Sequence, residues 1–144
     1  MSDDRKLEFV DTNVLVYAHD ISAGDKHSVA QQLIRRLWET SNGCLSVQIL
    51  QELYVTISRK VTRPLPITEA AEIIRDLSFW HIHTPTAEDV LGAIDLQHRY
   101  KISFWDAMVI HSAVSLECKL IWSEDLSRDQ IYNGVQVKNP FLIG

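Results

Sequence analysis

The chain has 144 residues, of which 46% are hydrophobic and 23% are charged, as in an ordinary folded domain. This balance excludes a disordered or fibrous protein, and every apolar run is far shorter than the roughly 20 residues that a membrane-spanning helix needs. The 19 acidic residues outnumber the 14 Lys and Arg residues and give a formal net charge of −5, which excludes a protein that binds nucleic acid through bulk positive charge.

Short β-rich segments alternate along the chain with longer segments of helical periodicity. This order is typical of an α/β fold with a mainly parallel sheet. We expect a single domain over residues 1–144, built as a three-layer α/β/α sandwich whose central sheet has about five short strands. The expected strands are 7–10, 44–46, 78–81, 119–122 and 135–137.

Helices are expected between these strands, where apolar residues recur every three or four positions. The first helix is expected to follow the acidic and polar triplet Asp11-Thr12-Asn13. The others are expected over 26–40, up to about Lys60, from Pro66 with Thr68 as its cap, from Thr86 to about Tyr100, and from Ser103 to about Glu117.

Two acidic residues follow predicted strands. Asp11 comes directly after the first strand, and Asp125 follows the fourth strand in the run Ser123-Glu124-Asp125. Ligands bind at the carboxyl edge of parallel sheets, because strand ends and helix N-termini converge there. Capping of the next helix is an alternative role for Asp11. Glu124 is an adjacent competitor for the role of Asp125.

Two further carboxylates are predicted on helices near the same edge. Glu52 lies between the apolar Leu50 and Leu53, where an unpaired buried carboxylate would be costly, and a solvent-exposed helix face is the alternative. Asp106 follows Ser103 at the spacing of a capping box, so a purely structural role is open to it as well.

Taken together, the four acidic segments favour a cation site. Carboxylates that cluster repel one another, and a divalent cation would offset that repulsion. The candidate donors are all oxygen atoms, which suit Mg²⁺ or Mn²⁺, and the sequence has no thiolate or paired-histidine spacing that would favour zinc. We predict that Asp11, Glu52, Asp106 and Asp125 hold Mg²⁺ or Mn²⁺.

The chain resembles PIN domains in the order and spacing of its acidic motifs. The matching segments are Phe9-Val10-Asp11-Thr12-Asn13-Val14-Leu15, Gln51-Glu52-Leu53, Phe104-Trp105-Asp106-Ala107 and Ser123-Glu124-Asp125. The resemblance covers essentially the whole chain and is greatest to short stand-alone PIN proteins, such as the VapC-type toxins of toxin–antitoxin pairs. It implies a PIN-like fold with Asp11, Glu52 and Asp106 centred on the metal, Asp125 as a more variable fourth residue, and Asn13 and Ser123 as supporting polar groups.

The resemblance implies a metal-dependent endoribonuclease that hydrolyses RNA phosphodiester bonds. It also implies a cognate antitoxin as partner, and homodimers are common among similar proteins. Arg59, Lys60 and Arg63 form the best basic cluster for contacts with RNA phosphates, with favourable charge at a helix C-terminus as the alternative.

Other functions fit the residues less well. A PIN-fold module that binds RNA or protein without catalysis would normally have lost acidic residues, and this chain keeps all four. A haloacid-dehalogenase-like phosphatase would need a second aspartate where Asn13 stands. A receiver-type signalling domain would need paired acidic residues after the first strand.

The cysteines and the N-terminal residues indicate a compartment. Cys44 and Cys118 lie far apart and form no metal-binding spacing, so we expect both to be reduced packing residues. Residues 1–6 are acidic before they are basic, and no long apolar stretch follows them, unlike a secretory signal. We therefore expect a cytoplasmic protein.

Overall fold

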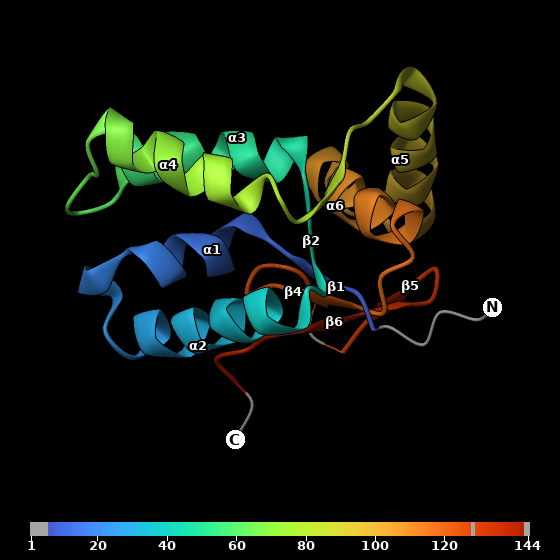
Figure 1. Cartoon of the computed structure of the whole chain (residues 1–144). Coiled ribbons are helices and arrows are strands. Elements are labelled where there is room, and N and C mark those ends of the chain that lie inside the picture. The colour runs from blue at the N-terminus through green and yellow to red at the C-terminus, as the bar shows by residue number, and fades with distance from the viewer. Residues whose placement is uncertain (1–5, 128, 143–144) are drawn as a thin grey trace.

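The fold is centred on a six-stranded sheet in the order β3-β2-β1-β4-β6-β5 (Figure 1). The structure is a computed structural model and describes residues 6–127 and 129–142. All neighbouring strands are parallel except β5 and β6, which form an antiparallel hairpin. The strands are β1 (Glu8–Val10), β2 (Gly43–Ser46), β3 (His81–His83), β4 (Leu120–Trp122), β5 (Ile131–Tyr132) and β6 (Val135–Lys138).

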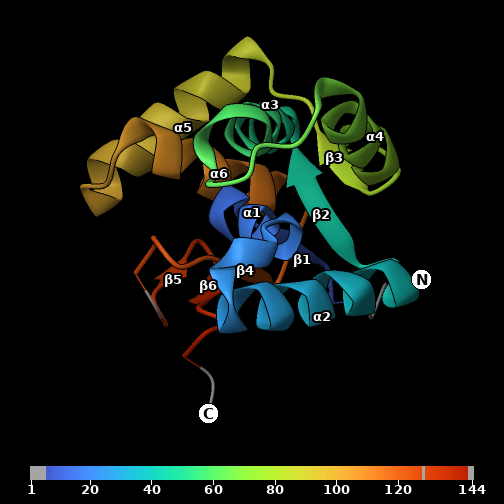
Figure 2. The same ribbon diagram turned by 90° about the vertical axis from the view of Figure 1, so that its left-hand side faces the viewer.

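Helices lie on both sides of this sheet. Figures 1 and 2 show α1 (Thr12–His19) and α2 (Asp25–Thr40) on one side, and α5 (Ala87–Tyr100) and α6 (Phe104–Ser115) on the other. The remaining helices are α3 (Val47–Val55) and α4 (Ile67–Leu77). The helix α3 continues as a π-helical turn (Thr56–Lys60), and a 3₁₀ turn (Ile21–Ala23) joins α1 to α2. This arrangement confirms the predicted three-layer α/β/α architecture.

The central strand β1 is buried along its whole length, as expected of a parallel strand covered on both faces. Phe9 pairs with Cys44 of β2 and with Ile121 of β4, and all three side chains are fully buried. Glu8 is the exception in this apolar strand. Its carboxylate accepts hydrogen bonds from Arg36 at 2.7 and 2.9 Å and from the Trp122 indole at 2.8 Å, so the buried charge is compensated.

Three helix caps that the sequence suggested are confirmed by their hydrogen bonds. Asp11 caps α1, Thr86 caps α5 in a complete capping box, and Ser103 caps α6. The helix α4 begins directly after Pro66, as predicted, but the predicted cap Thr68 is wrong, because Pro66 occupies the cap position without a side-chain bond. Proline suits a helix start, since its missing N–H would have no partner there.

The third strand begins later than predicted. Residues 78–80 continue the end of α4 as a turn, in which the Trp80 amide donates to the Leu77 carbonyl at 3.0 Å. The Trp80 ring then lies over Gly43, so closely that a Cβ on Gly43 would approach the ring to 2.3 Å. Residues 78–80 therefore form the turn after α4, with Trp80 buried and Phe79 exposed, and β3 starts at His81.

The strand β5 was not predicted. It forms a hairpin with β6 through Asn133 and Gly134, both of which have positive φ, 47° and 87°. An Asn-Gly pair is the strongest short-range signal for such a two-residue turn, because both residues tolerate positive φ.

Two further properties follow from the described residues. Cys44 and Cys118 are both buried, and neither forms a disulfide within the described residues. Over residues 6–127 and 129–142, the helices are all too short or too polar to cross a membrane.

Candidate active site

The order of the strands brings three polar segments together at the carboxyl edge of the sheet. β1 lies between β2 and β4, so Asp11, the helix α3 and the residues after β4 meet at one place. The register continues past the strands, because the Asp11 amide donates to the Trp122 carbonyl at 2.9 Å. Asp11 and Ser123 therefore lie side by side, as expected for the crevice of an open parallel sheet.

Asp11 is the most buried carboxylate of the site, with 8% of its surface exposed. One carboxylate oxygen accepts from the Thr12 amide at 2.8 Å, and the other accepts from the Ser123 hydroxyl at 2.7 Å. Burial, with smaller contributions from the charges of Glu52 and Asp125, raises the pKa of Asp11 to about 6 against the effect of these two donors. Asp11 thus caps α1 and also carries costly negative charge within the site.

Glu52 reaches the site from α3. Its carboxylate accepts from the Thr12 hydroxyl at 2.9 Å and from the Gln48 side-chain amide at 2.8 Å. The residue is exposed, which matches the solvent-exposed face considered for it, yet its carboxylate is held toward Asp11. Thr12 links the two acids, since its amide binds Asp11 and its hydroxyl binds Glu52. Thr12 was not predicted as a site residue, although its place between Asp11 and Asn13 was a signal.

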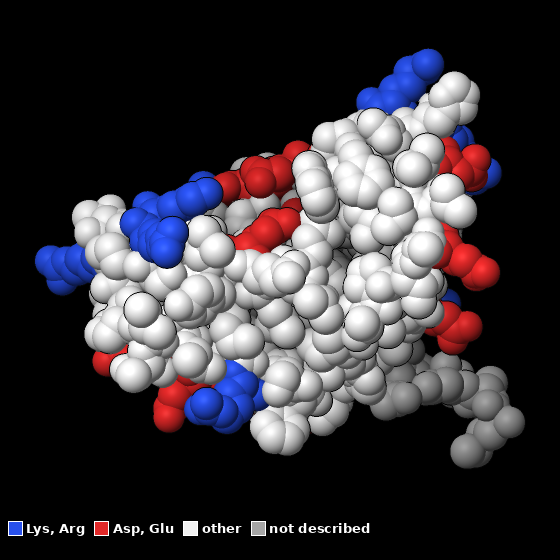
Figure 3. All heavy atoms as spheres, turned by 90° about the horizontal axis from the view of Figure 1, so that it is seen from above, with Lys and Arg blue, Asp and Glu red and all other residues white. Residues whose placement is uncertain are grey.

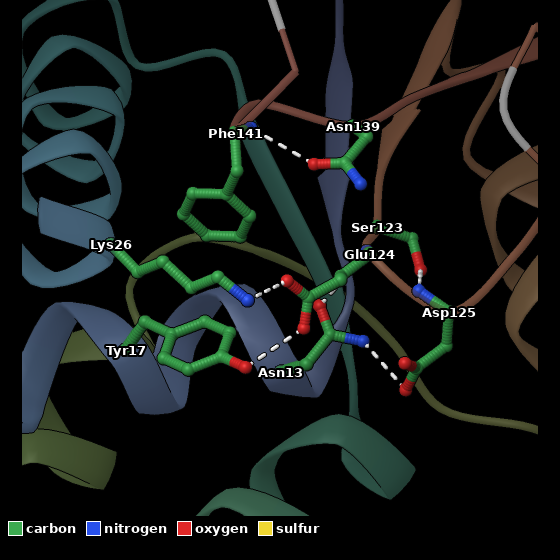
Figure 4. Close-up of polar contacts among 8 residues, drawn as sticks. All are labelled: Asn13, Tyr17, Lys26, Ser123, Glu124, Asp125, Asn139 and Phe141. Atoms are coloured by element: carbon green, nitrogen blue, oxygen red, sulfur yellow. Dashed lines mark hydrogen bonds and ion pairs between the residues drawn. The ribbon is translucent and has the colours of Figure 1, made fainter. Parts of the chain in front are cut away.

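The residues after β4 complete the network. Asn13 donates to the Asp125 carboxylate at 2.9 Å, and the Ser123 hydroxyl accepts the amides of Asp125 and Leu126 at 3.1 and 3.2 Å (Figure 4). The Ser123 side chain is fully buried and uses its hydroxyl both as donor and as acceptor. Asn13 and Ser123 therefore connect Asp125 to the segment that carries Asp11.

Glu124 points in another direction from Asp125. Its carboxylate accepts from the Tyr17 hydroxyl at 2.8 Å and forms an ion pair with Lys26, while Asp125 faces Asn13 (Figure 4). Between the two neighbouring acids, the geometry favours Asp125 as the member of the site.

Asp106 is less closely tied to the other acids. It is partly exposed on the first turn of α6, where its amide donates to the Ser103 hydroxyl at 3.1 Å. Within residues 6–127 and 129–142, the Asp106 carboxylate has no hydrogen bond to another candidate residue and does not bond back to the Ser103 amide to complete a capping box. The structure therefore joins Asp11, Glu52 and Asp125 through polar bridges and leaves Asp106 outside these bridges.

The candidate ligands are carboxylate oxygens, the type of atom that a hard divalent cation prefers. Figure 3 shows acidic side chains gathered around a hollow near the centre of one face. In the described part of the chain, no Lys or Arg forms an ion pair with any of the four candidate carboxylates. No three His, Cys, Asp or Glu residues among those described are already arranged around one ion position. Oxygen ligands suit Mg²⁺ or Mn²⁺, and binding such an ion requires the carboxylates to move toward a common point.

A surface groove of about 430 Å³ runs from the acidic site toward the predicted basic cluster. Its lining is Gln51, Glu52, Val55, Thr56 and Lys60. Figure 3 shows Lys and Arg side chains beside the acidic hollow, on the side where α3 leads into α4. Lys60 therefore shares a groove with Glu52, whereas Arg59 and Arg63 are exposed and do not line it.

A second polar cluster lies where β3, α5 and α6 meet. Asp89 accepts from His111 at 2.9 Å and lies 3.3 Å from His83, whose other ring nitrogen is 2.8 Å from the Ser112 hydroxyl. Bonds from Thr86, and then from His111, lower the pKa of Asp89 to about 2. These contacts link β3, α5 and α6 to one another.

Comparisons with known proteins agree with this architecture. The model of the PIN domain family matches residues 9–133. Curated protein sequences gave no match. Among solved structures, VapC20 of Mycobacterium tuberculosis, a sarcin-ricin loop cleaving toxin, is 18% identical, with 82% of this chain and 89% of that chain covered and a TM-score of 0.61.

Two solved complexes are also similar. A toxin–antitoxin complex from Klebsiella pneumoniae contains a chain that is 18% identical, with coverages of 94% and 99% and a TM-score of 0.69. The DNA-bound VapBC of Salmonella typhimurium contains one that is 15% identical, with coverages of 94% and 99% and a TM-score of 0.64. At these identities, the likeness shows a shared fold.

Proposed function

The chain belongs to the PIN-domain family, and from this premise we propose that it is a metal-dependent endoribonuclease that hydrolyses RNA phosphodiester bonds. One observation carries the proposal. The Asp11 carboxylate is buried, and its pKa is raised, so its negative charge is costly at neutral pH. Hydrogen bonds from Thr12, Asn13 and Ser123 nevertheless hold two further carboxylates, those of Glu52 and Asp125, beside it. A fold gains nothing in stability from gathering like charges, so a bound cation is the simplest reason for the arrangement.

In this proposal, Asp11, Glu52, Asp106 and Asp125 hold Mg²⁺ or Mn²⁺. When bound, the cation offsets the repulsion between the carboxylates and the RNA phosphate and stabilises the charge that develops as water attacks phosphorus. The protein's own residues orient the ligands. Ser123 and Thr12 fix the two oxygens of Asp11, Thr12 also fixes Glu52, and Asn13 fixes Asp125.

RNA is held by local positive charge, because the net charge of the chain is negative. Lys60 lies in the groove that begins at Glu52, so it can bind a phosphate close to the bond that is cut. Arg59 and Arg63 extend this positive surface beyond the groove. The three residues are the proposed RNA contacts.

We further propose that the chain is the toxin of a toxin–antitoxin pair and binds an antitoxin protein. Similarity to the Klebsiella pneumoniae and Salmonella typhimurium complexes supports this partner. A homodimer is proposed as well. Val90, Leu91 and Ile94 of α5 and Trp105 of α6 expose apolar surface that a second copy could cover.

Cleavage of a mixed RNA pool tests the enzymatic proposal. The purified chain should fragment RNA with Mg²⁺ or Mn²⁺ and stop when a chelator is added, and an Asp11→Asn variant should be inactive at any metal concentration. RNA binding without cleavage in every metal condition would overturn the proposal and favour an inactive PIN-fold module.

A further inference from the structure

Glu124 is adjacent to Asp125, yet both of its carboxylate oxygens are already engaged. One accepts from the Tyr17 hydroxyl of α1 at 2.8 Å, and the other forms an ion pair with Lys26 of α2 (Figure 4). About a quarter of the Glu124 side chain is exposed. These contacts point its carboxylate away from Asp125 and hold it against two helices.

Lys26 also contacts two aromatic rings, which help to hold it in place. Its ammonium group lies 5.0 Å from the centre of the Tyr17 ring and 5.4 Å from that of the Phe141 ring, within the range of cation–π attraction. The two rings pack edge to face at 5.2 Å, and the Phe141 amide donates to the Asn139 side chain at 2.9 Å. Residues of α1, α2 and the segment after β6 thus provide a fixed partner for Glu124.

The same face of α1 also holds the backbone of Glu124 and the side chain of Asp125. Asn13 accepts the Glu124 amide at 3.2 Å through its oxygen and donates to the Asp125 carboxylate at 2.9 Å through its nitrogen. Tyr17 lies one turn after Asn13, so both side chains project from one side of the helix. Glu124 is therefore the second anchor of a loop whose first anchor is the buried Ser123.

An exposed residue such as Asp125 has few packing contacts to fix it, so its position depends on these anchors. We propose that Glu124 is a positioning residue which, held by Tyr17 and Lys26, fixes the loop over residues 123–126 and presents Asp125 to the acidic site. This assignment rests on the proposed function, because it gives Asp125 a role in holding the cation. It also separates the roles of the two neighbouring acids.

Hydrogen exchange in the metal-free protein tests the anchoring directly. In a Glu124→Leu variant, the amides of Glu124, Asp125 and Leu126 should lose protection by about tenfold, while the Ser123 amide, which bonds to the Lys138 carbonyl, should keep it. The matched control is Glu72→Leu, which removes an exposed glutamate paired with Arg75 on α4 and should leave the loop unchanged.

Titration with Mn²⁺ tests the consequence for the site. The Glu124→Leu variant should bind Mn²⁺ roughly tenfold more weakly, as expected when a residue behind a ligand is lost. Glu124→Gln can still accept the Tyr17 hydrogen bond and should fall between Glu124→Leu and the unmodified protein. If Glu124→Leu does not fold, Tyr17→Phe and Lys26→Met each remove one of the two contacts and should produce smaller losses in the same direction.

The outcomes distinguish this inference from the proposed function. Unchanged loop exchange and unchanged Mn²⁺ affinity in all the Glu124 variants would overturn the positioning role, even if the protein cleaves RNA. An unmodified protein that neither binds Mn²⁺ nor cleaves RNA would overturn the proposed function and, with it, the role of presenting Asp125 to a cation.

Discussion

The hydroxyl of Ser123 donates a 2.7 Å hydrogen bond to Asp11 while accepting two amides of its own loop. A single buried side chain therefore connects the most buried acid of the site to the segment that carries Asp125. This link brings residues more than 100 positions apart in the chain together at one edge of the sheet.

Loss of this hydroxyl should affect both ends of the link. In Ser123→Ala, the pKa of Asp11 should rise further above its ordinary value, because the Ser123 hydrogen bond is the strongest influence that lowers it. We also expect Mn²⁺ affinity to fall by about tenfold. Carboxyl NMR titration and calorimetry measure the two effects. Ser123→Thr keeps the hydroxyl and should behave nearly as the unmodified protein does, and equal losses in both variants would contradict the prediction.

Asp11 should reduce the stability of the metal-free protein at neutral pH. Its folded-state pKa of about 6 lies above the ordinary 3.8, so the folded chain binds the proton more tightly than the unfolded chain does. The stability that this proton contributes is complete below about pH 4 and is lost as the pH rises through 6. In the presence of a chelator, Asp11→Asn should therefore be more stable than the unmodified protein by about 1–3 kcal/mol at pH 8, and this advantage should disappear at pH 4.

Urea unfolding at the two pH values measures this difference. Comparing the two proteins at each pH cancels the other titrating groups that they share. An Asp11→Asn variant that is less stable than the unmodified protein at pH 8 would contradict the prediction. Added Mn²⁺ should reverse the order, since only the protein with Asp11 gains stability from binding.

Asp89 should stabilise the packing of α5 on α6 without taking part in cleavage. Its carboxylate accepts the Thr86 amide in the capping box of α5 and bonds to His111, so Asp89→Ala should lower the free energy of unfolding by about 1–3 kcal/mol at pH 7. Because its pKa is lowered to about 2, this contribution is present above pH 4 and is lost as the pH falls toward 2.

Glu88→Ala is the matched control for Asp89→Ala. Glu88 is exposed on the same first turn of α5, and its loss should change stability by less than about 0.5 kcal/mol. Chemical unfolding measures both variants. If folded Asp89→Ala loses RNA cleavage while keeping its stability, the cluster has a role beyond the linkage of secondary-structure elements.

Lys60 should contribute to RNA binding and have no effect on the affinity for the cation. Its side chain lines the groove that begins at Glu52, so Lys60→Ala should raise KM several-fold and leave kcat and Mn²⁺ affinity nearly unchanged. The slope of the logarithm of RNA affinity against the logarithm of salt concentration should become smaller in magnitude by about one. Lys119→Ala is the control, because Lys119 is exposed before β4 at the opposite edge of the sheet. The same loss of RNA binding in both variants would indicate a general effect of net charge.

The fold and most of the candidate site could be predicted from local patterns. Caps such as Asp11, Thr86 and Ser103 depend on residues close in sequence, and strand ends follow from the α/β alternation. The start of β3 was misplaced because the tertiary contact of Trp80 with Gly43 decides it. The β5–β6 hairpin was missed although Asn133 and Gly134 carry its signal.

From sequence, only spacing separates Asp125 from Glu124, because Asp125 lies two residues after the Ser123 hydroxyl. Both are acidic, adjacent and at the end of the same strand. What separates them is a set of contacts with Asn13, Tyr17 and Lys26, which lie about 100 residues earlier in the chain. Contacts of this kind depend on the packing of α1 and α2 against the loop, which no local pattern encodes.

The sheet ends on both sides in very short strands, three residues in β3 and two in β5. A partner chain that extends a sheet needs a longer row of unpaired backbone groups than these provide. Backbone pairing is therefore a poor route to assembly for this molecule. Recognition by an antitoxin or by a second copy should therefore depend on side chains presented by the helices. The residues of such surfaces can diverge without altering the sheet.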